Sequence, residues 1–171
     1  MILSNTQQSK NMKTYKAPKT TLDDNEVFVF GANIQGFHGA GAAGFASFGE
    51  FGNVWRKYEY ASKPVGWKGK WNRKGLNGLQ EGREGKSYGL VTVTTAGAKN
   101  SLTDEQRLKY IKELYECCRK HSELRFFLAQ SGKTGLNGVN PKHLLALYTS
   151  IEIPNNLYFD ESFAILGMVG E

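Results

Sequence analysis

The chain has 171 residues, of which 40% are hydrophobic and 12% aromatic, and its formal net charge is +6. It has no apolar run near the roughly 20 residues of a membrane span, and its first 20 residues are too polar for a signal peptide. Its only cysteines, Cys117 and Cys118, are neighbours that point apart on a helix, so we expect one domain in a reducing cytoplasm without disulfides.

The N-terminal part is predicted to be a polar arm followed by a strand and a glycine-rich loop. Residues 1–20 are expected to be a flexible arm, and residues 21–171 the folded domain. Val27 to Phe30 is a short apolar run, typical of a central strand buried on both faces. Small residues from Ala40 to Phe48 predict a helix packed closely on that strand. A glycine loop between a strand and a helix offers N–H groups and partial positive charge to phosphate.

Residues 53–87 show no period and are predicted to be long loops. Within them, the segment 55–75 is basic and aromatic, because it holds all three tryptophans and seven Lys or Arg residues against Glu59 alone. These residues are Trp55, Trp67 and Trp71, with Arg56, Lys57, Lys63, Lys68, Lys70, Arg73 and Lys74. The segment accounts for the whole net charge, and nucleotides or polyanions are its natural partners.

The next elements are a strand and a long helix. Tyr88 to Thr95 is rich in β-branched residues and predicts a strand. Thr103 to His121 predicts a helix, since Thr103 and Gln106 form a capping-box pattern at its start. Helical spacing predicts one buried face, made of Leu108, Ile111, Leu114, Tyr115 and Cys118.

The C-terminal part repeats the order of strand, glycine loop and helix. Leu124 to Ala129 predicts a strand, and residues 130–138 form a second glycine-rich segment. Asn140 is expected to cap a helix that starts at Pro141 and continues to about Tyr148. The last predicted elements are a strand, Leu157 to Phe159, and a closing turn, Phe163 to Leu166.

This alternation of strands and helices predicts an α/β layered domain with a largely parallel sheet. Ligands of such sheets bind beyond the carboxyl ends of the strands. The strands that end near Phe30 and Ala129 both continue into glycine-rich segments. If these two strands are neighbours, the two segments face one another across one cleft.

Two well-known phosphate motifs match only in part. Gly39 to Gly44 reads Gly-Ala-Gly-Ala-Ala-Gly, like the dinucleotide fingerprint, but it does not follow the strand directly and Glu59 lies in the basic segment. Residues 132–134, Gly-Lys-Thr, resemble the end of a P-loop, but Phe127 stands where that motif needs a glycine. The sequence favours neither motif and leaves open a glycine loop of another kind around phosphate.

Several segments, in order, resemble a small family of bacterial and phage proteins related to macrodomains, which are ADP-ribose-binding modules. They are Phe28 to Asn33, His38 to Ala43, Phe48 with Gly49, Gly85 to Leu90, Leu124 to Gly138 and Leu157 to Phe163. The resemblance covers about residues 22–168. It implies a three-layer macrodomain-like fold, with a sheet flanked by helices and the phosphate loop in residues 130–138.

The resemblance also implies which residues touch the ligand. Asn33 matches the asparagine that contacts the distal ribose, residues 39–42 match the glycines along the ribose and diphosphate, and residues 131–137 match the loop around the diphosphate. The full expected set is Gly31, Ala32, Asn33, His38, Gly39, Ala40, Gly41, Ala42, Ser131, Gly132, Lys133, Thr134, Gly135, Leu136, Asn137, Trp67 and Trp71. The aspartate that commonly reads adenine has no clear match, and Asp23 and Asp24 are the nearest candidates.

The basic segment 55–75 departs from the family, whose members are expected to have a short link there. One interpretation is an insertion that closes as a lid, with Trp67 or Trp71 stacked on a base and cationic side chains on phosphates. The other is a solvated basic loop whose tryptophans pack against the edge of the core.

The sequence favours binding over catalysis, because neither glycine-rich segment contains a carboxylate that could act as a general acid or base. We therefore expect a module that binds ADP-ribose or a related NAD-derived nucleotide. In a phage it would sequester a defence signal in the host cytoplasm. No cofactor, metal or membrane partner is expected, and a homo-oligomer stays open.

Two alternatives stay open. The first is an ADP-ribosyl hydrolase or ADP-ribose phosphatase, in which Asn33 and His38 surround a water held by the ligand's phosphate. The second is a single-strand nucleic-acid-binding protein that uses Trp55, Trp67 and Trp71 as a stacking platform. For Asn33 itself, the plain structural interpretation is an asparagine that caps a turn.

Overall fold

The structure is a computed structural model, and it describes residues 12–17, 19, 21–34, 77–81, 85–95, 98–129 and 139–163. The strands in these ranges are β1 (Thr14–Tyr15), β2 (Glu26–Asn33), β3 (Gly78–Glu81), β4 (Lys86–Val93), β5 (Arg125–Leu128) and β6 (Leu157–Asp160). The helices are α4 (Asp104–Lys120) and α5 (Pro141–Thr149).

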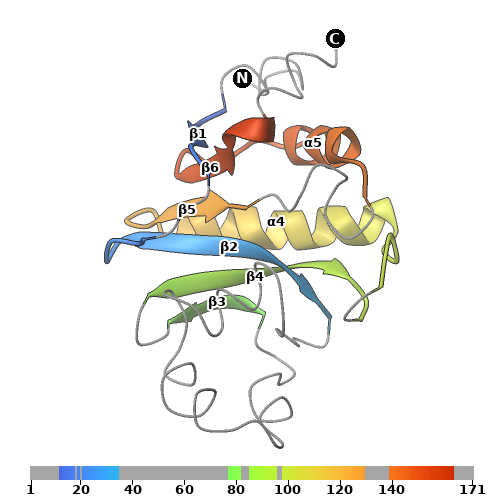
Figure 1. The fold of residues 1–171 in the computed structure, drawn as a ribbon, viewed down its shortest axis with the longest axis horizontal. Helices are drawn as coiled ribbons and strands as arrows, with labels where there is room; N and C mark the ends of the chain where they lie inside the picture. Colours follow the sequence, from blue (N-terminus) through green and yellow to red (C-terminus); the bar gives the residue numbers. More distant parts are fainter. Residues whose placement is uncertain are drawn as a thin grey trace, which may run out of the picture.

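The six strands form one sheet in the order β1-β6-β5-β2-β4-β3. Figure 1 shows them stacked in this order, from β1 and β6 at the top to β3 at the bottom. The pairs β1–β6, β6–β5, β5–β2 and β2–β4 are parallel, and β3 pairs with β4 in the antiparallel sense. The predicted α/β class with a largely parallel sheet is confirmed.

Strand β2 is central and buried on both faces, as its continuous apolar run predicts. It lies between β5 and β4. Val27 and Val29 are 0% exposed and belong to the main core, which α4 and α5 also enter. Phe28 and Phe30 alternate with them and belong to a second cluster on the other face. Both faces of β2 are therefore packed, the first in the main core and the second in this smaller cluster.

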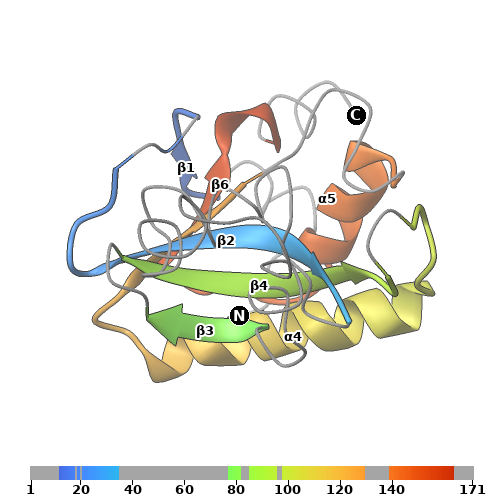
Figure 2. The same cartoon turned by 60° about the horizontal axis from the view of Figure 1, so that its bottom comes forward.

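Helix α4 covers the first of these faces (Figure 2). Its capping box is present, since the Thr103 hydroxyl accepts from the Gln106 N–H at 3.1 Å and the Gln106 side chain accepts from the Thr103 N–H at 2.9 Å. The predicted face is mostly correct, with Ile111, Leu114, Tyr115 and Cys118 buried. Leu108, however, is only partly buried.

Helix α5 also begins as predicted. The Asn140 side chain accepts from the Lys142 N–H at 2.8 Å, and Pro141 occupies the first turn, where a missing N–H is harmless. The Tyr115 hydroxyl of α4 donates to the Tyr148 carbonyl of α5 at 2.6 Å. This buried bond joins the two helices on one side of the sheet.

Two strands lie where the sequence did not predict them. β3 lies within residues 53–87, which were predicted to be loops, and β4 begins at Lys86 rather than Tyr88. β1 lies within the predicted arm, where the Tyr15 hydroxyl donates to the Leu128 carbonyl at 3.0 Å. β1 and β3 are short and lie at the two edges of the sheet, so pairing with a neighbouring strand decides their conformation more than local propensity does.

Other predicted elements lie outside the described residues. These are the helix from Ala40 to Phe48, the basic segment 55–75, the glycine-rich segment 130–138 and the end of the closing turn beyond Phe163. Phe163 itself is buried in the main core against Tyr148 and Phe159.

Candidate functional site

The candidate site lies at the carboxyl edge of the sheet, where β2 and β4 end side by side at Asn33 and Val93 and β5 ends earlier, opposite Val29. β2 and β5 are parallel neighbours, and the Ala129 N–H just after β5 donates to the Val29 carbonyl at 3.0 Å. The chain leaves β2 at Ile34 and β5 at Ala129, so both glycine-rich segments start from the same edge of the sheet. The adjacency on which the predicted two-loop cleft depends is thus confirmed.

Asn33 ends β2 at this edge and is only 5% exposed. The register with β4 shifts between Ala32 and Asn33, an irregularity of the kind that re-aims side chains near binding sites. The Asn33 carbonyl accepts from the Asn77 side-chain amide at 2.8 Å, and the Ile34 N–H donates to the Val93 carbonyl at 3.1 Å. The end of β2 is therefore held from two sides.

The expected ligand contacts divide into two groups. Gly31, Ala32 and Asn33 lie together at the end of β2, where the Thr92 hydroxyl donates to the Ala32 carbonyl at 3.3 Å. The Ala32 side chain is buried in the second core cluster with Phe30. The others lie outside the described residues: His38, Gly39, Ala40, Gly41, Ala42, Ser131, Gly132, Lys133, Thr134, Gly135, Leu136, Asn137, Trp67 and Trp71.

The two aspartates considered for adenine lie at the wrong edge for this site. Asp23 and Asp24 precede β2, and the Asp23 N–H donates to the Glu26 carboxylate at 2.8 Å. At roughly 3.3 Å per residue, the eight residues of β2 separate them from Asn33 by about 25 Å. A carboxylate that does lie at the carboxyl edge is Asp160, at the end of β6, where it accepts from the Ser162 N–H at 3.0 Å.

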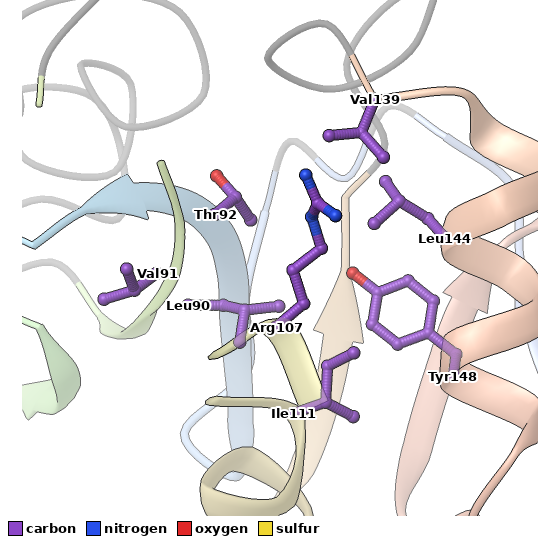
Figure 3. Close-up of a pocket in the computed structure, with 8 residues that line it drawn as sticks. All are labelled: Leu90, Val91, Thr92, Arg107, Ile111, Val139, Leu144 and Tyr148. Atoms are coloured by element: carbon purple, nitrogen blue, oxygen red, sulfur yellow. The ribbon is translucent and has the colours of Figure 1, made fainter. Parts of the chain in front are cut away.

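A buried arginine next to this edge is absent from the sequence prediction. Arg107, on the second turn of α4, enters the space between β4 and α5 (Figure 3), and its side chain is 7% exposed. Its guanidinium donates to Asp104 at 2.7 Å and also to the Asn100 side chain. The sequence does contain one signal for this contact, because Asp104 and Arg107 are three positions apart, a spacing that brings two side chains of a helix together.

Asp104 connects this arginine to the second helix. The carboxylate oxygen that accepts from Arg107 lies 2.8 Å from His143 Nε2, on the first turn of α5. The hydrogen bonds from His143 and Arg107 hold the pKa of the Asp104 carboxyl below its ordinary value. Burial raises the pKa of the nearby Tyr148 phenol, which stays neutral.

The side chains around Arg107 enclose a small cavity (Figure 3). Its lining is mainly apolar and consists of Leu90, Val91, Thr92, Arg107, Ile111, Val139, Leu144 and Tyr148. Its volume is about 10 Å³. This is roughly the space of one water molecule, so the cavity is too small to hold a nucleotide.

The described part of the chain shows neither a metal-binding cluster nor an activated thiol. It contains no group of three or more His, Cys, Asp or Glu side chains that could hold a metal ion. Cys117 and Cys118 are free thiols whose pKa values are raised by burial, which disfavours the nucleophilic thiolate. Neither α4 nor α5, the helices that the structure describes, is long and apolar enough to cross a membrane. A comparison of the chain with protein-family models, curated proteins and solved structures found no match.

Proposed function

We propose that the protein binds ADP-ribose or a related NAD-derived nucleotide at the carboxyl edge of β5 and β2. The observation that carries this proposal is the parallel adjacency of the two strands that lead into the glycine-rich segments. Neighbouring strands lie about 4.8 Å apart, and β5 ends opposite Val29, about 13 Å before the end of β2, so the two segments leave the same edge of the sheet from adjacent strands.

The residue types at this edge fit such a ligand. Glycine-rich segments that connect strands to helices offer backbone N–H groups to phosphate oxygens. Asn33, fixed at the end of β2, has the amide chemistry to bind a ribose hydroxyl. Lys133 adds a cation to the second segment. Together with the resemblance to macrodomains, these features favour ADP-ribose over a simple phosphate.

The carboxylates near the edge support binding without cleavage. Asp104 is held ionised by Arg107 and His143, so it is a poor general acid. Asp160 lies two strands away from β2, a separation of about 10 Å, and already accepts from a backbone N–H. We therefore propose that the protein sequesters its nucleotide, and in a phage this would remove a defence signal from the host cytoplasm.

The decisive experiment measures binding and chemistry on one sample. Isothermal titration calorimetry with ADP-ribose gives the affinity, after which the protein is denatured and the released ligand is analysed by mass spectrometry. Intact ligand supports sequestration. A hydrolysed product contradicts it and favours the hydrolase or phosphatase, and the absence of any binding heat or retained ligand removes ADP-ribose as the ligand.

Replacing Gly41 tests the first glycine-rich segment. We expect Gly41→Val to abolish ADP-ribose binding, because a branched side chain keeps the backbone away from the diphosphate. Gly41→Ala adds a single methyl group and should lose less affinity. Calorimetry checks both variants, and thermal unfolding confirms that they fold. Unchanged affinity in the folded valine variant would mean that the ligand binds elsewhere.

A further inference from the structure

We propose that Arg107 is a positioning residue for the nucleotide site, because it ties α4 to the loop after β4 and, through Asp104, to the start of α5. In this way it fixes the point where the second glycine-rich segment, residues 130–138, joins α5. The ligand in this inference rests on the proposed function, whereas the geometry rests on the described residues alone.

The guanidinium group joins two separate parts of the chain. One nitrogen donates to Asp104 in the first turn of α4 at 2.7 Å, and another donates to Asn100, in the loop that follows β4. A planar guanidinium has a rigid fork of donors, so two simultaneous bonds fix its position more firmly than one would. Arg107 therefore holds the loop after β4 against the start of α4.

The same network continues to α5 through a single oxygen atom. Asp104 Oδ1 lies 2.7 Å from Arg107 Nη1 and 2.8 Å from His143 Nε2. His143 is in the first turn of α5, three residues after the N-cap Asn140. Val139, just before that cap, is buried and lines the same small cavity as Arg107 (Figure 3). The chain that emerges from residues 130–138 is thus anchored by both packing and hydrogen bonds.

A purely stabilising role fits this arrangement poorly. Arg107 is buried, and its Nε has no acceptor among the residues that the structure describes. Buried cations of this kind add little net stability, because desolvation offsets the attraction to their partners. Asp104 and Asn100 are both exposed, so water can satisfy them if the arginine is removed. We therefore expect the loss of Arg107 to displace the start of α5 and the loop after β4 more than it lowers the free energy of unfolding.

The first test measures ADP-ribose affinity by calorimetry in four single variants. We expect Arg107→Met and His143→Leu each to weaken binding about tenfold, through displaced loop geometry. Arg107→Lys should retain part of the affinity, since it keeps the charge but loses the fork. Arg119→Met is the matched control, because it makes the same change near the exposed end of the same helix, where Arg119 donates to the Glu152 carbonyl.

The double variant Arg107→Met/His143→Leu tests whether the two residues act as a unit. Since both contact the same oxygen of Asp104, the combined loss should be smaller than the product of the single losses. A full product of the two losses would show independent action and would overturn the network. Unchanged affinity in both single variants would overturn the positioning role.

Hydrogen exchange in the absence of ligand separates this inference from the proposed function. The N–H groups of Lys142 and Leu144 bond to Asn140, and we expect them to exchange faster in Arg107→Met and His143→Leu than in Arg119→Met. Equal rates in all variants would reject the inference. If the unmodified protein fails to bind ADP-ribose, the proposed function is wrong, and the exchange rates still decide the role of Arg107. Circular dichroism excludes variants that do not fold, and the lysine variant then takes their place.

Discussion

Asp104 shows how much a single side chain contributes to the arrangement of α4 and α5 beside the carboxyl edge of the sheet. Its position at the start of α4 suits a carboxylate, because the N-terminus of a helix carries partial positive charge. Its two hydrogen-bond donors, Arg107 and His143, come from different helices. The folded state therefore favours the ionised form, and this preference links the stability of the protein to pH.

We expect the free energy of unfolding to fall when Asp104 is protonated. Because its pKa is lower in the folded state than the ordinary value of 3.8, its contribution is complete above that value and is lost as the pH falls through the folded-state pKa. Asp104→Asn should flatten the pH dependence of stability below about pH 4. Urea unfolding between pH 2.5 and pH 6 measures this, and Glu105→Gln, an exposed neighbour in the same turn, is the control. An identical pH profile in the Asp104 variant would contradict the prediction.

At the residue scale, the sequence predicted what local patterns determine. Thr103, Asn140 and Pro141 have their predicted roles because each acts on residues within one helical turn. Arg107 was missed because a charged residue in a helix normally faces water, and its burial depends on Asn100 and on α5. Asp23 and Asp24 precede β2 and so lie at the opposite edge of the sheet from Asn33. Which edge they occupy depends on the direction of the strand in the sheet, and the two residues themselves do not indicate it.

At the scale of elements, the end of α4 is held by a residue far away in sequence. The Asn156 side chain, just before β6, donates to the carbonyls of Cys118, His121 and Leu124, at 2.8, 3.1 and 2.8 Å. Helix ends leave carbonyls without partners, and a local pattern usually satisfies them. Here the partner of Cys118 is 38 residues away, so sequence reading could predict the start of the helix but not this cap.

We expect Asn156→Ala to destabilise the protein by about 1–3 kcal/mol, because several partly buried carbonyls lose their donor together. Asn156→Asp should cost at least as much, since it places a negative charge next to a helix C-terminus. Asn155→Ala is the matched control, because the Asn155 side chain is exposed and it is the backbone carbonyl, which alanine keeps, that accepts from Lys13. Chemical denaturation measures all three, and an alanine variant as stable as the control would show that water replaces the cap.

At the scale of the whole molecule, the sheet determines where the two glycine-rich segments begin. The sequence predicted the strands, but whether β2 and β5 are neighbours depends on pairing between residues about 100 positions apart. Their parallel pairing brings Asn33 and Ala129 to one edge and turns two separate sequence patterns into one candidate site. β1 and β3, at the two ends of the sheet, were missed because short edge strands carry little sequence signal.

Tryptophan fluorescence offers a direct test of whether the basic segment 55–75 takes part in nucleotide binding. All three tryptophans lie in it, so the intrinsic tryptophan fluorescence of the protein reports on this segment alone. If the segment closes on the nucleotide, ADP-ribose should change the emission spectrum. Trp67→Ala or Trp71→Ala should then weaken binding by about 1–3 kcal/mol, the contribution of one base–aromatic stack.

Two outcomes would contradict this closing role. Calorimetric binding without any change in tryptophan emission, together with full affinity in both alanine variants, would make the segment a bystander. Oligonucleotide binding that falls steeply with salt concentration would instead support the single-strand nucleic-acid alternative, because each neutralised phosphate releases counterions. The affinities for ADP-ribose and for an oligonucleotide can be compared as the salt concentration rises. ADP-ribose has only two phosphates, so its binding should depend on salt far less than the binding of a polyanion with many phosphates.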